Sequence, residues 1–262
     1  MSKLLSLHPE LRVPIQLGPL AGTRGIDTIR TIPLSSDGFL AREGSRLVIY
    51  INERLPSARQ RFTCAHEIGH TYFSSPRPSG SATISCQTGF ANRPKQEEYL
   101  CDVFAAELLM PTKAVEDMLH KEGVSIKTAQ RMALGFHVSL SAAVWRMCEM
   151  AGDEVGFIWF RPMGKPTDPD DVKLRVDWGA FPTRERTYLP RHDSVPRNSL
   201  VAKSFSSNQV VRGIEKVDLG ALRGKRYLTC QRLNEAVLCL VFLDEPSDHD
   251  RRYRPPEPLL ET

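Results

Sequence analysis

Residues 66–70 read His-Glu-Ile-Gly-His, so two histidines lie four positions apart and a glutamate follows the first. On an α-helix these two positions share one face, and both imidazoles can bind a single small cation. Zinc suits this pattern, because catalytic zinc takes three protein ligands and keeps one position for water. The metal lowers the pKa of that water, and Glu67 can take its proton and return it to a leaving amine. His66, Glu67 and His70 therefore predict a metal-dependent peptidase.

The alternative interpretation is a pair of surface histidines on an ordinary helix. The residues around the motif argue against it, because Phe62, Ala65, Gly69 and Phe73 are spaced as one apolar stripe of a helix. A buried site needs such a stripe to anchor its helix. We therefore expect the motif to belong to a packed helix rather than to an exposed one.

A third protein ligand must come from the acids downstream of the motif. A third histidine six positions after His70 is excluded, because Pro76 stands there. Glu97 and Glu98 open a second predicted helix, on which Glu98 and Asp102 are four apart and share a face. We favour Glu98 as the third ligand and expect Asp102 to accept the free ring N–H of a ligand histidine. Glu97 is the alternative ligand, and on this helix it would point elsewhere, into solvent.

Two histidines and a distant glutamate make the predicted centre a gluzincin-like zinc site. Histidine and carboxylate ligands also accept Mn²⁺, which stays the alternative metal. Tyr72 and Tyr99 are the candidate donors of a hydrogen bond to the oxyanion of a tetrahedral intermediate. Tyr72 lies two positions past His70 and so on another face of the helix.

The elements that must position these residues can be located from the pattern. Residues 45–52 form a β-branched and aromatic run that predicts a strand. Helices are predicted at 58–73 after the N-cap Ser57, at 96–110 before Pro111, at 113–121 between Thr112 and Gly123, and in two segments of 125–150. A loop is predicted at 74–94. Three apolar runs predict strands at 155–160, 174–178 and 236–243.

Two stretches together resemble the ImmA/IrrE family of metallopeptidases. They are R-Q-R-F-T-C-A-H-E-I-G-H at 59–70 and E-Y-L-C-D-V-F-A-A-E-L-L-M-P at 98–111, and D-G-F-L from Asp37 is also similar. The likeness covers roughly residues 13 to 115. It implies Glu98 as metal ligand and Asp102 as its helper. It also implies site-specific proteolysis of a DNA-bound helix-turn-helix repressor inside the cell, which derepresses stress-response or mobile-element genes.

Cys101 departs from the family pattern, in which alanine is common at that position. The order of parts also resembles the IrrE branch, where a helix-turn-helix-like segment and a GAF-like domain follow the peptidase domain. Here residues 129–145 would be the helical segment. Its main basic residues are Arg131 and Arg146, which are few for a surface that contacts phosphates. We therefore favour a packing module there, and direct DNA binding stays open.

Composition and charge set the class of protein. The chain has 262 residues, 41% of them hydrophobic and 25% charged, as expected for a globular protein. The net charge of +4 does not by itself argue for nucleic acid. No apolar stretch is long enough for a bilayer, residues 1–12 do not read as a signal peptide, and the six cysteines form no C-x-x-C pair. We expect a cytoplasmic protein with buried, reduced cysteines and no membrane partner.

These observations predict an α+β protein in three parts. Residues 1–118 would form a zincin-like metallopeptidase domain, 119–150 a helix-turn-helix-like module, and 151–262 an α+β domain that is GAF-like and senses a ligand. The predicted function is metal-dependent cleavage of a helix-turn-helix transcriptional repressor. The rivals are a stress- or ligand-sensing regulator that does not cut, and a DNA-binding transcription factor.

Overall fold

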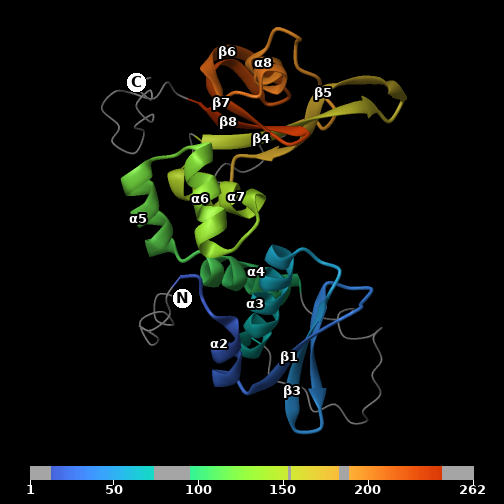
Figure 1. Cartoon of the computed structure of the whole chain (residues 1–262), viewed down its shortest axis with the longest axis vertical. Helices are drawn as coiled ribbons and strands as arrows, with labels where there is room; N and C mark the ends of the chain where they lie inside the picture. The colour runs from blue at the N-terminus through green and yellow to red at the C-terminus, as the bar shows by residue number, and fades with distance from the viewer. Residues whose placement is uncertain (1–12, 74–94, 153–154, 183–188, 244–262) are drawn as a thin grey trace. The chain divides into compact units, whose positions relative to one another are not determined.

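The computed structural model describes residues 13–73, 95–152, 155–182 and 189–243. The chain divides into two compact units, one of residues 1–112 and 132–139 and the other of residues 113–131 and 140–262. Both contain helices and strands, so the predicted mixed α+β class is confirmed at that level (Figure 1). The domain boundaries after residues 118 and 150 stay predictions. Within the described residues, every helix is too short or too polar to span a membrane.

The first unit is a small sheet packed against helices. Its elements are α2 (Leu17–Thr23), β1 (Ile26–Ile32), β2 (Gly38–Glu43), β3 (Arg46–Asn52), α3 (Ser57–Phe73) and α4 (Lys95–Leu109). The central strand β3 pairs in parallel with β1 and antiparallel with β2, so β2 is an edge strand. The strand predicted at 45–52 and the helices predicted at 58–73 and 96–110 are confirmed to within a residue or two. The loop predicted at 74–94 lies outside the described residues.

The core of this unit joins the sheet to α3 and α4. Buried apolar side chains come from β3, from α3 and from α4; they include Ile49, Ile51, Cys64, Ala65, Ile68, Phe104, Ala105 and Leu108. Of the predicted stripe on α3, Ala65 is buried and Phe62 packs at the edge of this core. Gly69 is buried as well, so the stripe is confirmed for its described members except that Phe62 is only partly buried. Cys64 and Ile68, which the predicted stripe did not include, are also buried in this core. The side chain of Phe73 lies outside the described residues.

The second unit combines short helices with a larger sheet. Its elements are α5 (Thr112–Glu122), α6 (Ile126–Phe136), whose last turn belongs to the first unit, α7 (Leu140–Ala151), β4 (Val155–Lys165), β5 (Asp168–Ala180), α8 (Leu200–Ser207), β6 (Val211–Leu219), β7 (Leu222–Leu233) and β8 (Ala236–Phe242). The sheet is antiparallel, in the order β5-β4-β8-β7-β6. Helix α8 packs on β6, β7 and β8, while α7 packs on β4. The predicted change from helices to strands near residue 155 is confirmed.

Candidate metal centre

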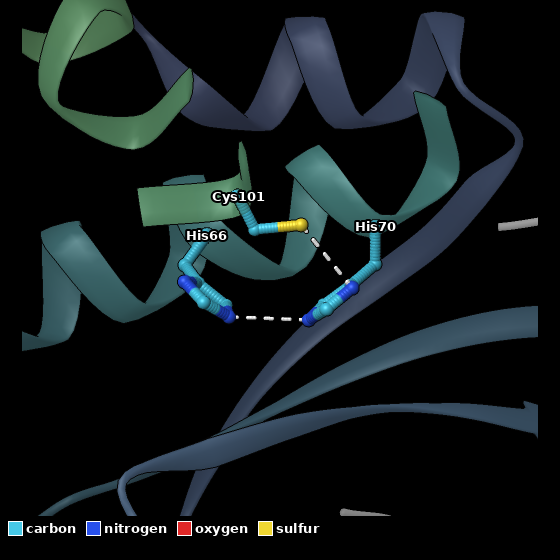
Figure 2. Close-up of side chains that lie close together, drawn as sticks. All are labelled: His66, His70 and Cys101. Carbon is cyan, nitrogen blue, oxygen red and sulfur yellow. Dashed lines mark hydrogen bonds between the residues drawn. The ribbon is translucent and has the colours of Figure 1, made fainter. Parts of the chain in front are cut away.

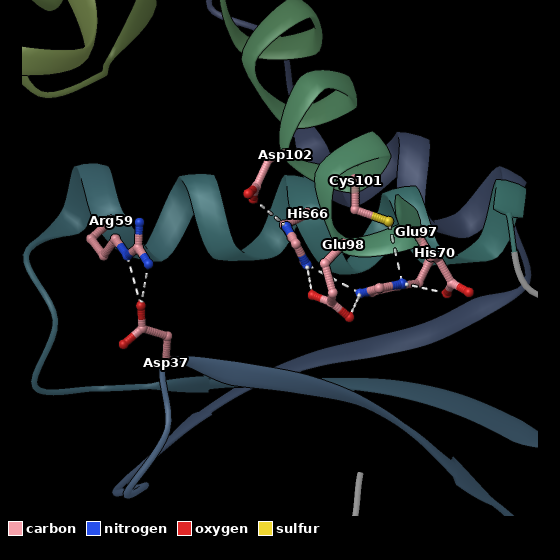
Figure 3. A network of polar contacts seen from close by, with 8 residues as sticks. All are labelled: Asp37, Arg59, His66, His70, Glu97, Glu98, Cys101 and Asp102. Carbon is pink, nitrogen blue, oxygen red and sulfur yellow. Dashed lines mark hydrogen bonds and ion pairs between the residues drawn. The ribbon is translucent and has the colours of Figure 1, made fainter. Parts of the chain in front are cut away.

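Gly69 allows α3 and α4 to approach closely. A Cβ at Gly69 would lie 3.2 Å from Phe104 Cδ1 and 3.4 Å from the Cα of Cys101. The first distance is tighter than most methyl contacts and the second is at the lower limit of ordinary contact, so a side chain larger than a methyl group would push α4 away. The close approach brings the first two turns of α4 over His66 and His70 (Figure 3). This residue therefore sets the distance between the two helices that carry the site.

The two histidines of α3 turn their Nε2 atoms toward each other. These atoms are 3.1 Å apart, and the ring planes meet at 75°. The carboxylate of Glu98 lies on the same side, with Oε2 3.2 Å from His66 Nε2 and Oε1 3.6 Å from His70 Nε2 (Figure 3). Two ring nitrogens and one carboxylate thus converge on a common point. That donor set fits a zinc or manganese ion.

The other ring nitrogen of each histidine faces an acid of α4. His66 Nδ1 lies 2.8 Å from Asp102 Oδ1, and His70 Nδ1 lies 3.0 Å from Glu97 Oε1. The side chain of Glu97 is only 16% exposed, so the expectation that it would point into solvent is wrong. It fails because α4 lies close enough for two adjacent faces of the helix to reach the histidines. The structure brings His66, His70, Glu98 and Asp102 together as the sequence predicts, and it adds Glu97.

Cys101 gives the site a second donor set (Figure 2). Ligand atoms of His66, His70 and Cys101 all lie within 4.8 Å of one another, and the cysteine is fully buried. Its Sγ, however, is 3.2 Å from His70 Nδ1, on the opposite side of that ring from Nε2. A metal between the two Nε2 atoms would face Glu98 rather than the sulfur. The geometry therefore favours the two-nitrogen, one-carboxylate set.

Glu67 lies beside this point and is only 2% exposed. It lines a cavity of about 300 Å³ together with His66, Glu98 and Asp102. The rest of the cavity wall comes from the start of β2 and from α3, through Ser36, Asp37, Gly38, Arg59, Phe62 and Thr63. A buried carboxylate in a cavity next to three converging donors has the position that a general base needs.

An ion pair ties the start of β2 to the first turns of α3 along this cavity. Arg59 Nε donates to Asp37 Oδ2 at 2.7 Å, and its NH2 lies 2.6 Å from the same oxygen (Figure 3). The guanidinium also lies over the ring of Phe62, 5.4 Å from its centroid. In the sequence, Asp37 stands out only as the first residue of the D-G-F-L stretch. Its pairing with Arg59, which is 22 positions away, becomes visible only in the folded chain.

The part of the chain that contains α3 and α4 is similar to known proteins. The model of a protein family described as "IrrE N-terminal-like domain" matches residues 23–147, which include all of α3 and α4. The radiation response metalloprotease IrrE of Deinococcus radiodurans is 32% identical over 180 residues. Residues 23–147 therefore belong to the ImmA/IrrE family. The protein of the same name from Deinococcus deserti is 33% identical over 136 residues.

The aligned stretches cover 68% and 51% of this chain but 52% and 47% of the two IrrE proteins. The chain therefore spans about half the length of the curated relatives it matches. A solved structure, a Mycobacterium tuberculosis transcriptional regulator, covers 87% of this chain and 70% of its own. Its TM-score is 0.46 and its sequence identity 13%, so this likeness does not bear on the function.

The two candidate oxyanion donors of this ImmA/IrrE domain lie apart from the cavity lining. The ring of Tyr72 packs on Phe104 with the centroids 5.1 Å apart, and the Arg24 guanidinium covers it at 3.9 Å. Burial raises the pKa of the Tyr72 hydroxyl. Tyr99 is 66% exposed on α4. Among the described residues, those that line the cavity around Glu67 include neither tyrosine.

Proposed function

We propose that this chain is a metal-dependent endopeptidase of the gluzincin-like type, with a zincin-like domain that contains α3 and α4. His66, His70 and Glu98 hold the metal, with zinc favoured and manganese as the alternative. The observation that carries the proposal is the meeting of both Nε2 atoms and the Glu98 carboxylate beside the buried Glu67. Membership of a family that includes proteins named metalloproteases supports it.

When bound, the metal supplies Lewis acidity that polarises the scissile carbonyl and makes the attacking water more acidic. Glu67 takes the proton of that water as it attacks the peptide carbonyl. The same carboxylate then gives the proton to the leaving amide nitrogen. Asp102 holds the His66 ring in place by accepting from Nδ1. In this account the residues of the chain perform positioning and proton transfer.

We propose that the substrate is a helix-turn-helix transcriptional repressor, cut at one site in the cytoplasm to release stress-response or mobile-element genes. The support is the resemblance to the ImmA/IrrE family through residues 59–70 and 98–111. The printed name of the Deinococcus relatives, radiation response metalloprotease, is consistent with a role in stress.

The test is a survey of new protein termini in host cells that produce the wild-type chain or Glu67→Gln. This variant keeps the metal donors and loses the base, so cleavage should fall by about 10²–10⁴-fold. Glu235→Gln, in the exposed turn between β7 and β8, is the matched control and should behave as wild type. Cleavage of a small repressor only by the wild type and Glu235→Gln supports the proposal. Identical profiles for all three chains, at rest and under stress, contradict it.

A non-cleaving, ligand-sensing regulator is the second candidate, and one observation favours it. The second unit contains a cavity of about 200 Å³ between the sheet and the region of α8, lined by apolar groups such as Phe160 and Val201 and by Glu215. The cavity supports a proposal that residues 151–262 are a GAF-like sensor. If Val201→Trp, which would fill the cavity, abolishes the response of host genes while Glu67→Gln does not, sensing without cleavage is the better account.

Direct DNA binding is the least supported alternative. We propose that residues 119–150 form a helix-turn-helix-like packing module rather than a DNA reader. Arg131 lies 2.9 Å from a Glu122 carboxylate oxygen, and Arg146 lies 2.6 Å from one of Glu149. Paired guanidinium groups are poorly placed to contact phosphates. A DNA affinity that fell steeply with salt would contradict this view.

A further inference from the structure

Helix α4 presents two parallel rows of polar side chains to α3. Glu98 and Asp102 form one row, and Glu97 and Cys101 form the other, because residues four apart lie on one face of a helix. The first row contacts His66, through both of its members. The second row contacts His70 at Nδ1, again through both members. The Nδ1 atom of each histidine thus faces its own row, whereas Glu98 lies near the Nε2 atoms of both histidines.

The Nδ1 atom of His70 needs an acceptor if its Nε2 atom is to bind a metal. A neutral imidazole carries one proton, and a ring that offers Nε2 as a ligand keeps that proton on Nδ1. Glu97 Oε1 lies 3.0 Å from this nitrogen. The relation repeats the one between Asp102 and His66, where the distance is 2.8 Å. The His70 side chain is 1% exposed, so water is a poor substitute for a protein acceptor there.

We propose that Glu97 is the positioning residue of His70. It accepts the Nδ1–H, fixes the tautomer, and aims Nε2 at the point shared with His66 and Glu98. The proposal rests on the proposed function, because it presumes a metal on the Nε2 side. It assigns a role to a side chain next to Glu98, and it makes the site symmetrical, with one carboxylate behind each ligand histidine.

Cys101 also contacts His70 Nδ1 and is the competing candidate for this role. Its Sγ lies 3.2 Å away, but a thiol is a weak acceptor, whereas a carboxylate forms a charge-assisted hydrogen bond. If Cys101 donated its own proton to Nδ1 instead, the imidazole proton would sit on Nε2 and block metal binding there. Glu97 therefore holds the ring, and Cys101 fills the buried space beside it.

The experiment measures zinc affinity of the full chain by competition with a chromophoric chelator. Glu97→Ala should bind zinc about 10–100-fold more weakly than wild type, as expected when an outer partner of a ligand histidine is lost. Glu97→Gln, whose amide oxygen can still accept, should recover most of the affinity. Cys101→Ala is the matched control from the same row and should bind as wild type does. The melting temperatures of the metal-free variants should stay close to that of the metal-free wild type, which separates positioning from a general structural defect.

Three results would overturn the proposal in different ways. If Glu97→Ala binds zinc as tightly as the wild type does, Glu97 does not position His70. A loss in Cys101→Ala that exceeds the loss in Glu97→Ala assigns the role to the sulfur. If His66→Ala or His70→Ala binds zinc as tightly as the wild type does, the presumed metal centre is wrong. That result would contradict the proposed function.

Discussion

The α3–α4 pair and the five-stranded sheet of the second unit both bury polar side chains, but with different partners. In the helix pair, the buried His70 contacts the partly buried Glu97, and the buried Glu67 lines a cavity. In the sheet, Arg175 is equally buried. Its guanidinium donates to the main-chain carbonyls of Met163, Asp171 and His192, and it also pairs with the Asp171 carboxylate. The first arrangement gathers side-chain groups at one point. The second satisfies the backbone of a long hairpin and its neighbouring loop.

The cysteines of the helix pair and of the sheet also differ in their partners. Cys101 lies against a histidine in the helix pair, whereas Cys230 and Cys239 face each other across β7 and β8 in the apolar core. Burial raises the pKa of the Cys64 thiol to about 12, so that buried cysteine is held as an uncharged apolar group. Burial of a reactive residue type is therefore not by itself a sign of chemistry. What separates the site is convergence of several donors beside a cavity.

Removal of the carboxylate ligand should have the largest effect. Glu98→Ala takes away one of three converging donors, so zinc affinity should fall by more than about 100-fold, beyond the range for an outer partner. Chelator competition measures this change. Glu235→Ala in the exposed β7–β8 turn is the control. If Glu98→Ala bound zinc within a few-fold of the wild-type affinity, Glu98 would not be a metal ligand, and the helix pair would not differ from the sheet in this respect.

Arg175→Met tests whether the buried charge of the sheet is purely structural. It leaves three main-chain carbonyls without their donor, so the free energy of unfolding should fall by about 3 kcal/mol. Zinc affinity should not change. Denaturant unfolding checks the first expectation. Lys173→Met is the matched control, because Lys173 pairs with the same Asp171 carboxylate at the surface and should contribute no more than about 1 kcal/mol.

Gly38→Ala tests the contact of the edge strand β2 with α3. A Cβ there would lie 2.5 Å from Thr63 Cγ2 and 2.6 Å from the carbonyl oxygen of Tyr50, so backbone must move. The free energy of unfolding should fall by about 1–3 kcal/mol. Gly22→Ala in α2, where a Cβ meets nothing within 4 Å, should be neutral or slightly stabilising in the same denaturant measurement. Equal behaviour of the two variants would contradict the close packing of β2 on α3.

Cys230→Ala should give the smallest effect. The lost sulfur contacts only its core neighbours, so the free energy of unfolding should fall by about 1 kcal/mol and zinc affinity should stay at the wild-type value. Thermal unfolding and chelator competition on the same samples check both. A change in zinc affinity would link the sheet to the metal centre and break the comparison.

The sequence predicted the site helices well because their boundaries carry strong local signals. Pro111 lies between α4 and α5, and Gly123, with φ of 69°, ends α5 where expected. The apolar runs of β4 and β8 were also found, since both strands lie in the middle of the sheet and are buried on two faces. These elements can be read from their own residues.

Strands β6 and β7 and helix α8 were not predicted. The edge strand β6 alternates exposed residues with partly or fully buried ones, and β7 carries Arg223, Lys225 and Arg226 among its apolar positions. Neither strand therefore gives a continuous apolar run. Glu97 was misjudged for a different reason. A helical wheel separates Glu97 from Glu98 by about 100°, but it contains no information on how closely α3 approaches. That distance depends on Gly69, which lies on the other helix.

The most direct test of the central claim is X-ray absorption spectroscopy of the zinc-loaded chain. The two donor sets differ in one atom, because Glu98 supplies oxygen and Cys101 supplies sulfur. We expect one zinc per chain with only nitrogen and oxygen neighbours at about 2.0–2.1 Å. A sulfur neighbour at about 2.3 Å would place the metal on the Cys101 side of His70 and would contradict the account.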